Sequence, residues 1–153
     1  MLDRVITVAM TISSLLVLCF WFRYTCSLIL KTATSQEDAG EKVAQAYHLG
    51  YPEAHERLSN GATELDRLAN ELDRLHEMLD RDYATLTALM NQAKGTQDGI
   101  ERRMLSLHYT MMAASYRLSR RISPAASLKA LEEMSTVVAY FANSMGEGAE
   151  SPA

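Results

Sequence analysis

The amino-acid sequence predicts an all-α protein with a single transmembrane helix at the amino terminus, followed by an antiparallel helical bundle or coiled-coil domain. Three observations lead to this prediction. Residues 5–22 contain no charged side chain, and a leucine pattern with a seven-residue period lies near the middle of the chain. Ala, Leu, Met, Glu and Arg dominate the polar remainder, and these residue types favour helix.

The charge-free run spans residues 5–22 and reads VITVAMTISSLLVLCFWF. As a helix it is about 27 Å long, close to the roughly 30 Å hydrocarbon core of a bilayer. Aromatic side chains at 20–22 and 24 surround Arg23, as in the aromatic belts that flank membrane spans. We therefore expect residues 1–31 to form a transmembrane anchor with a short amino-terminal tail.

Two other interpretations of this run fit the residues less well. A cleaved signal peptide usually has an apolar region of about 7–15 residues, followed by small residues at the cleavage site. This run is longer, and Arg23 and Tyr24 occupy the place of the cleavage site. A buried helix of a soluble protein would need a larger core than this chain provides. The chain is thus predicted to be a single-pass protein of the cell membrane, in an orientation that the balanced charges of Arg4, Arg23 and Lys31 do not set.

Residues 32–145 are predicted to form one helical domain, and residues 146–153 a disordered tail. Proline occurs only at 52, 124 and 152, which leaves long stretches free to be helical. Gly50 with Pro52, then Gly95, and then Ser123 with Pro124 mark the breaks between helices. These signals predict helices over 35–49, 52–58, 63–94, 99–122 and 124–145.

The helix over 63–94 carries the clearest pattern of the chain, leucines that recur every seven residues along two rows. Such a period keeps one stripe against a partner helix, as in left-handed coiled coils. The leucines of this predicted interaction seam are Leu65, Leu68, Leu72, Leu75, Leu79, Leu86 and Leu89. Asp82 stands where a further leucine is due. Ion pairs on the flanks contribute only about 0.2–0.5 kcal/mol each, so the leucines supply most of the association energy.

The two helices that follow carry similar apolar rows. Over 99–122 the row is Ile100, Met104, Leu107, Met111, Ala114 and Leu118. Over 124–145 it is Leu128, Leu131, Met134, Val138, Phe141 and Met145. Only residues 95–98 separate the first two helices, which favours an antiparallel hairpin within a bundle. Packing within the chain is the favoured use of the leucine seam, and pairing between two copies stays open.

Five arginines of the helix over 99–122 fall within one arc of about 100°. They are Arg102, Arg103, Arg117, Arg120 and Arg121. A functional interpretation is a stripe that binds anionic lipid headgroups, a nucleic acid or an acidic protein. The favoured, plainer interpretation is a solvated face that pairs with the acidic helix over 63–94. Tyr109 and Tyr116 border the stripe on the side away from the apolar row, which suggests an outer contact surface.

Charge and motifs narrow the function classes. Beyond residue 31 the chain carries 18 acidic and 12 basic residues, so no nucleic-acid partner is expected. No pattern defines catalytic residues, a metal site or a cofactor site, and we do not expect an enzyme. The sequence predicts a structural or interaction component, a scaffold or tether whose partners are the bilayer and either itself or another helical protein. The alternative is a sensory or signal-relay module with a ligand-responsive helical bundle.

Overall fold

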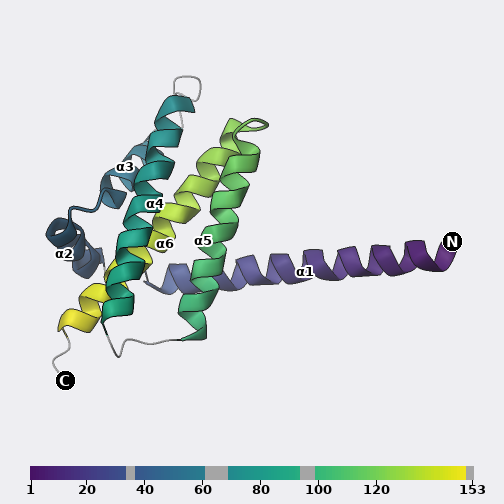
Figure 1. Ribbon diagram of the computed structural model, residues 1–153, viewed down its shortest axis with the longest axis horizontal. Helices are drawn as coiled ribbons and strands as arrows, with labels where there is room; N and C mark the ends of the chain where they lie inside the picture. The colour runs from purple at the N-terminus through teal and green to yellow at the C-terminus, as the bar shows by residue number, and fades with distance from the viewer. Residues whose placement is uncertain (34–36, 61–68, 94–98, 151–153) are drawn as a thin grey trace.

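The computed structural model describes residues 1–33, 37–60, 69–93 and 99–150 (Figure 1). These residues form six helices and no strands, which confirms the predicted all-α class. The helices are α1 (Leu2–Ala33), α2 (Glu37–Tyr47), α3 (Tyr51–Asn60), α4 (Ala69–Gln92), α5 (Ile100–Ser119) and α6 (Pro124–Glu150).

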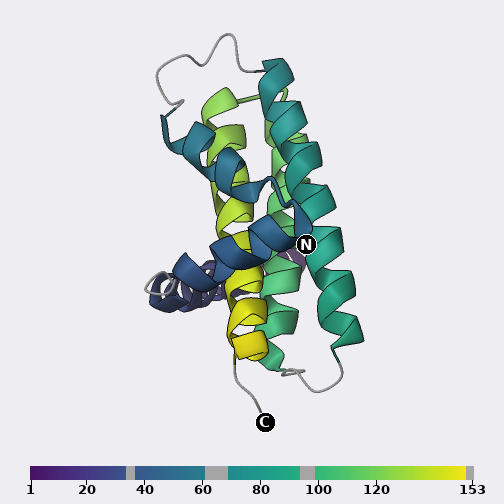
Figure 2. The same cartoon turned by 90° about the vertical axis from the view of Figure 1, so that its left-hand side faces the viewer.

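Helix α6 is the centre of the packing and contacts each of the other five helices. It is the most apolar helix after α1, and its sequence places apolar residues on more than one side. Its fully buried side chains include Leu131, Met134, Val137, Val138 and Phe141. Figure 1 shows α4, α5 and α6 running side by side, with α2 and α3 on one side and α1 projecting from the other. In Figure 2, α2 crosses over α6.

Helix α1 is long and apolar enough to cross a membrane. Its Leu2–Lys31 segment has a mean hydropathy of 2.3 over the most apolar window, and none of that window is buried within the chain. The carboxyl end of the same helix behaves differently, because Cys26 and Leu30 are buried in the core between α5 and α6. One continuous helix therefore joins an exposed apolar rod to the packed helices.

The contact between α4 and α5 consists of tyrosines and carboxylates rather than leucines. The rings of Tyr83 and Tyr109 stack with their centroids 3.9 Å apart. Tyr109 donates a hydrogen bond to Asp80, and Tyr116 donates one to Asp73, each over 2.8 Å. Burial and these carboxylates raise the pKa of both phenols, so both remain protonated donors at neutral pH.

The apolar row predicted for α5 faces the core only in part. Met104 and Met111 pack against the core, but other members of the row are exposed. Ile100, Leu107 and Leu118 are 79%, 54% and 72% exposed. The buried residues of α5 are Leu105, His108, Tyr109, Met112 and Tyr116. The tyrosines decide this rotation, because each ring buries a large area while its hydroxyl reaches a carboxylate on α4. The prediction of Tyr109 and Tyr116 as an outer contact surface is wrong for the same reason.

Helix α6 begins at the residue where the sequence places its start, but it extends beyond the expected end. The helix begins at Pro124, and the Ser123 hydroxyl lies 3.5 Å from the backbone nitrogen of Ala126, where a capping residue places it. The helix then continues to Glu150, whereas the sequence predicted a disordered tail from residue 146. Gly146 is buried against α2 and leaves no room for a side chain there: a Cβ would lie 2.6 Å from the carbonyl oxygen of Ala39. This contact supports the additional helical turn.

Helix α2 ends at Tyr47, slightly before the predicted end near Leu49. His48 takes the left-handed conformation with a φ of 52°. The Leu49 amide then donates to the Ala44 carbonyl oxygen over 2.9 Å, which closes the helix end as in a Schellman motif. Gly50, expected to end this helix, instead lies against the Met78 side chain of α4.

Replacing Gly146 by alanine should lower the free energy of unfolding by about 1–3 kcal/mol, because the added methyl group forces two helix backbones apart. Gly40→Ala is the matched control. Its Cβ would meet only the ends of side chains, those of Asn143 and Tyr51, and no backbone atom. Chemical denaturation of the full chain in detergent micelles, followed by circular dichroism, measures both losses. Equal losses would contradict a backbone contact at Gly146.

Candidate functional site

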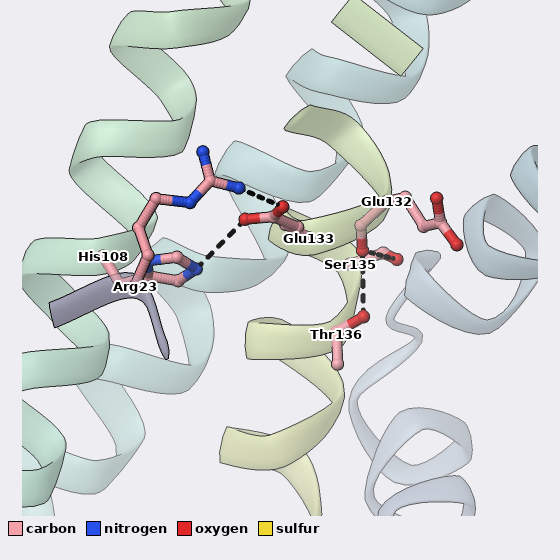
Figure 3. A network of polar contacts seen from close by, with 6 residues as sticks. All are labelled: Arg23, His108, Glu132, Glu133, Ser135 and Thr136. Atoms are coloured by element: carbon pink, nitrogen blue, oxygen red, sulfur yellow. Dashed lines mark hydrogen bonds and ion pairs between the residues drawn. The ribbon is translucent and has the colours of Figure 1, made fainter. Parts of the chain in front are cut away.

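The candidate site lies where α1 meets α5 and α6, close to the end of the charge-free run. Arg23 of α1 donates a hydrogen bond to Glu133 of α6, with 2.6 Å between Nη2 and Oε1. His108 of α5 places Nε2 3.4 Å from the other carboxylate oxygen, Oε2. Figure 3 shows the Arg23 and His108 side chains converging on Glu133. One carboxylate therefore connects three helices.

The electrostatic surroundings keep Glu133 ionised. Its side chain is 25% exposed, and that of Arg23 is 46% exposed. Burial alone would raise the pKa of Glu133, but the hydrogen bond with His108 and the positive charge of Arg23 together hold the pKa below its ordinary value of 4.5. At neutral pH the carboxylate is thus an ionised acceptor for both neighbours.

His108 is buried, with 2% of its surface exposed, and it lies beside the Phe22 ring of α1 at a centroid distance of 6.4 Å. When Nε2 carries the proton it can donate to Glu133, which leaves Nδ1 as an acceptor. Among the described residues Nδ1 has no hydrogen-bond partner. A buried polar atom without a partner costs about 1–3 kcal/mol of folding free energy. The buried position of the His108 ring therefore lowers the stability of the fold.

A cavity of about 750 Å³ opens beside this network. Its charged and aromatic lining comes from α1, α5 and α6 and consists of Phe20, Arg23, Tyr24, Lys31, His108, Lys129, Glu132 and Glu133. Groups of both signs suit a polar or zwitterionic ligand better than an apolar one. Over the described ranges, no three His, Cys, Asp or Glu side chains gather closely enough to hold a metal ion.

No protein-family model, curated protein or solved structure matches the chain. What the protein does must therefore be inferred from its own residues and their geometry. Sequence reasoning noted Arg23 only as a belt residue and missed its partners His108 and Glu133. The adjacent acids Glu132 and Glu133, which interrupt the most apolar part of α6, were the signal that could have revealed them.

In the structure, the described leucines of the seam pack against other helices of the same chain. Leu72, Leu75, Leu79 and Leu86 are buried in one cluster with residues of α5 and α6, and Leu89 is half-buried. Leu65 and Leu68 lie outside the described residues. The buried leucines are therefore covered by the protein's own helices.

Asp82, which interrupts the seam, has a defined structural role. It is 2% exposed, and its Oδ2 accepts a hydrogen bond from the Gly50 amide over 2.7 Å. Burial raises the pKa of Asp82, although bonds from the Gly50 and Tyr51 amides partly oppose the rise. Amides at a helix start lack partners within the helix. Asp82 of α4 therefore caps α3 from a neighbouring helix.

The predicted arginine stripe is divided between two roles. Arg120 forms an ion pair with Asp73, and Arg102 donates a hydrogen bond to Asn91 over 2.6 Å, so these two contact α4. Arg103, Arg117 and Arg121 are exposed and form no salt bridge with the described residues. Arg120 thus pairs with the acidic helix, and tyrosines also occupy the carboxylates of Asp73 and Asp80.

The Arg23 and Glu133 side chains should be energetically coupled. Arg23→Gln and Glu133→Gln should each lower the free energy of unfolding, and the double variant should show a coupling of up to about 1 kcal/mol.

The pKa of Glu133 in the folded protein is depressed, so the stabilisation by Glu133 is present above pH 4.5 and is lost as pH falls through that folded pKa. The difference in Tm between wild type and Glu133→Gln should therefore shrink below pH 4.5. Glu132→Gln is the matched control. If the losses of the Arg23→Gln and Glu133→Gln variants simply add in the double variant, the two side chains are not coupled.

Substitutions at Asp82 should separate its hydrogen-bonding role from its charge. Asp82→Asn keeps an acceptor and should cost less than about 1 kcal/mol, whereas Asp82→Leu completes the leucine row but should cost about 1–3 kcal/mol because the Gly50 amide loses its partner. The pKa of Asp82 in the folded protein is raised. The contribution of Asp82 to the free energy of unfolding therefore falls as pH rises through that pKa. Asp82→Asn should gain stability relative to wild type over the same rise. Denaturation curves in micelles test both statements, and a leucine variant as stable as the asparagine variant would refute the capping role.

Proposed function

We propose that this chain is a single-pass membrane protein in which α1 anchors an antiparallel helical bundle at the membrane surface, where it serves as a scaffold or tether. One observation carries the proposal. The exposed apolar helix that can cross a membrane is continuous with the buried core of the folded part. The bundle and its anchor therefore behave as one mechanical unit.

The same continuity favours a retained anchor over a cleaved signal sequence. Signal cleavage follows closely behind the apolar run. In this chain, that cut would remove the Arg23 partner of Glu133, and cuts further along would remove Cys26 and Leu30 from the core. Loss of buried side chains of this size typically costs several kcal/mol. Cleavage would thus damage the domain that it releases.

The packing of α4, α5 and α6 supports the bundle. Each of α4 and α5 lies along α6, and short connections are typical of antiparallel neighbours. Coiled-coil character belongs to α4, where the leucines keep the heptad period and face the other helices of the chain. Self-association or the binding of another helical protein would then use an outer surface rather than the leucine seam.

The three-helix network at Glu133 supports a mechanical role. It fixes the end of α1 against α5 and α6 and so sets the direction in which the anchor leaves the bundle. A tether benefits from such a fixed geometry, because it presents its surfaces to partners in one orientation relative to the bilayer. Two anchored copies would also meet at a raised effective concentration.

A second candidate function is a sensory or signal-relay module, which the cavity beside His108 favours. A ligand there would touch α1, α5 and α6 together, because residues of all three helices, His108 among them, line the cavity. Binding would bias how α1 is attached to the bundle. The two candidates differ in what they need, since a tether works without a ligand.

The full-length chain should remain in the membrane pellet after alkaline carbonate extraction, and mass spectrometry should find its amino terminus intact. Leu15→Arg with Leu16→Arg should release the protein into the supernatant, because each charge costs about 2.5–3.5 kcal/mol at the centre of a span. Both positions are exposed, so the core is unaffected.

A mature chain that begins between residues 23 and 31 would contradict the anchor.

The tether role is tested separately, by crosslinking of intact cells before purification in mild detergent. Recovery of multimers or of a defined partner protein is expected, and recovery of monomers alone would contradict that role.

A further inference from the structure

We infer that the outer face of α5 lies against the surface of an anionic bilayer, beside the point where α1 enters it. The outer face comprises Ile100, Arg103, Leu107, Arg117 and Leu118, followed by Arg121 just past the end of the helix. The inference rests on the proposed anchoring by α1 and names the surface of the bundle that meets the lipid.

The outer face has the composition of a helix that binds at a membrane interface. At 100° per residue its five helical positions fall within an arc of about 100°, opposite the buried face formed by Leu105, Met112 and the two tyrosines. All of its side chains are exposed, and its apolar members are among the most exposed hydrophobics outside α1. Exposed large apolar side chains beside arginines are typical of helices that lie in the headgroup region.

The arrangement of the helices directs this face toward the membrane. Figure 1 shows α1 leaving the fold transverse to α4, α5 and α6, and α5 is on the side toward which α1 projects. The two helices meet where the Phe22 ring lies 6.4 Å from that of His108. Phe22 is the last residue of the charge-free run, so α5 crosses α1 at the level expected for the interface. A bilayer spanned by α1 would therefore meet α5 along its length.

Charge favours lipid over the other occupants of such a face. Arg103, Arg117 and Arg121 form no salt bridge with described residues, and the nearby acids of α4 are bound by tyrosines or by Arg120. In a two-fold dimer through this face the arginines of both copies would face one another and repel. An anionic leaflet supplies the opposite charge along the whole face. The rest of the domain is acidic, so such a leaflet would attract this side and repel the others.

Fluorescence quenching in proteoliposomes tests the inference with the full chain. Leu118→Cys in a Cys19→Ala background carries an environment-sensitive dye, and the buried Cys26 is retained. Gln45→Cys on α2, at the opposite side of the fold, carries the control dye. Vesicles contain brominated phosphatidylcholine, with or without phosphatidylglycerol. Trp21, the single tryptophan, lies in α1 and reports insertion of the anchor independently.

We expect quenching of Trp21 in both vesicle types, and quenching of the dye at 118 but not at 45 when phosphatidylglycerol is present. Arg103→Gln, Arg117→Gln and Arg121→Gln should each lower the ratio of docked to undocked protein about fivefold. Arg74→Gln with Arg81→Gln on α4, both exposed, is the matched control and should change nothing.

Three results would overturn the inference. Quenching of Trp21 with equal signals at 118 and 45 would refute the contact of α5 while leaving the anchor intact. The dye at 118 could instead be protected from quenching in a way that depends on protein density in the vesicles and not on lipid charge. That result would show that a second copy of the chain covers the outer face. Absence of Trp21 quenching would refute the anchor itself, and with it the proposed function.

Discussion

The attachment of α1 to the folded helices depends on how one half-buried carboxylate, that of Glu133, is compensated. This carboxylate sits on α6, the helix that all the others contact, and it accepts hydrogen bonds from an arginine of α1 and a histidine of α5. A buried charge is tolerated only where partners of opposite charge or good hydrogen bonds compensate its desolvation. Arg23 supplies that compensation from the end of the apolar rod. The ion pair between Arg23 and Glu133 therefore has two effects: it compensates the carboxylate on α6, and it attaches α1 to the folded helices.

The tyrosines of α5 have an effect that reaches beyond the packing of two helices. By donating hydrogen bonds to Asp73 and Asp80, they occupy carboxylates that would otherwise attract the neighbouring arginines. Only Arg120 shares one of these acids. Three arginines are left on the outer surface with their charge uncompensated by α4. The positive charge of the outer face of α5 is therefore not offset by these two acids.

Much of the fold follows from local signals in the sequence. The charge-free run predicts α1, and the proline at 124 predicts the start of α6, because each of these signals acts within one or two turns of helix. The leucines of α4 also identify a stripe that is buried. The buried face of α5 was predicted only in part, because that helix carries two neighbouring stripes of suitable period. The partners of the tyrosines on α4 decide which stripe is fully buried. Asp82, Gly146 and Glu133 escaped prediction for a related reason, since each is explained by a contact with a helix distant in sequence.

The continuity of α1 has a consequence for how such a protein would respond to bilayer thickness. The part of α1 outside the packed helices, residues 2–22, makes a rod of about 32 Å. That length is close to the thickness of the hydrocarbon core, and spanning helices commonly tilt when a membrane thins. Because the end of the rod is fastened to α5 and α6, a tilt would rotate the folded helices by the same angle. The rotation would lift one end of α5 away from the headgroups and press the other end into them. Contact along α5 would therefore oppose tilting and hold the rod near the membrane normal.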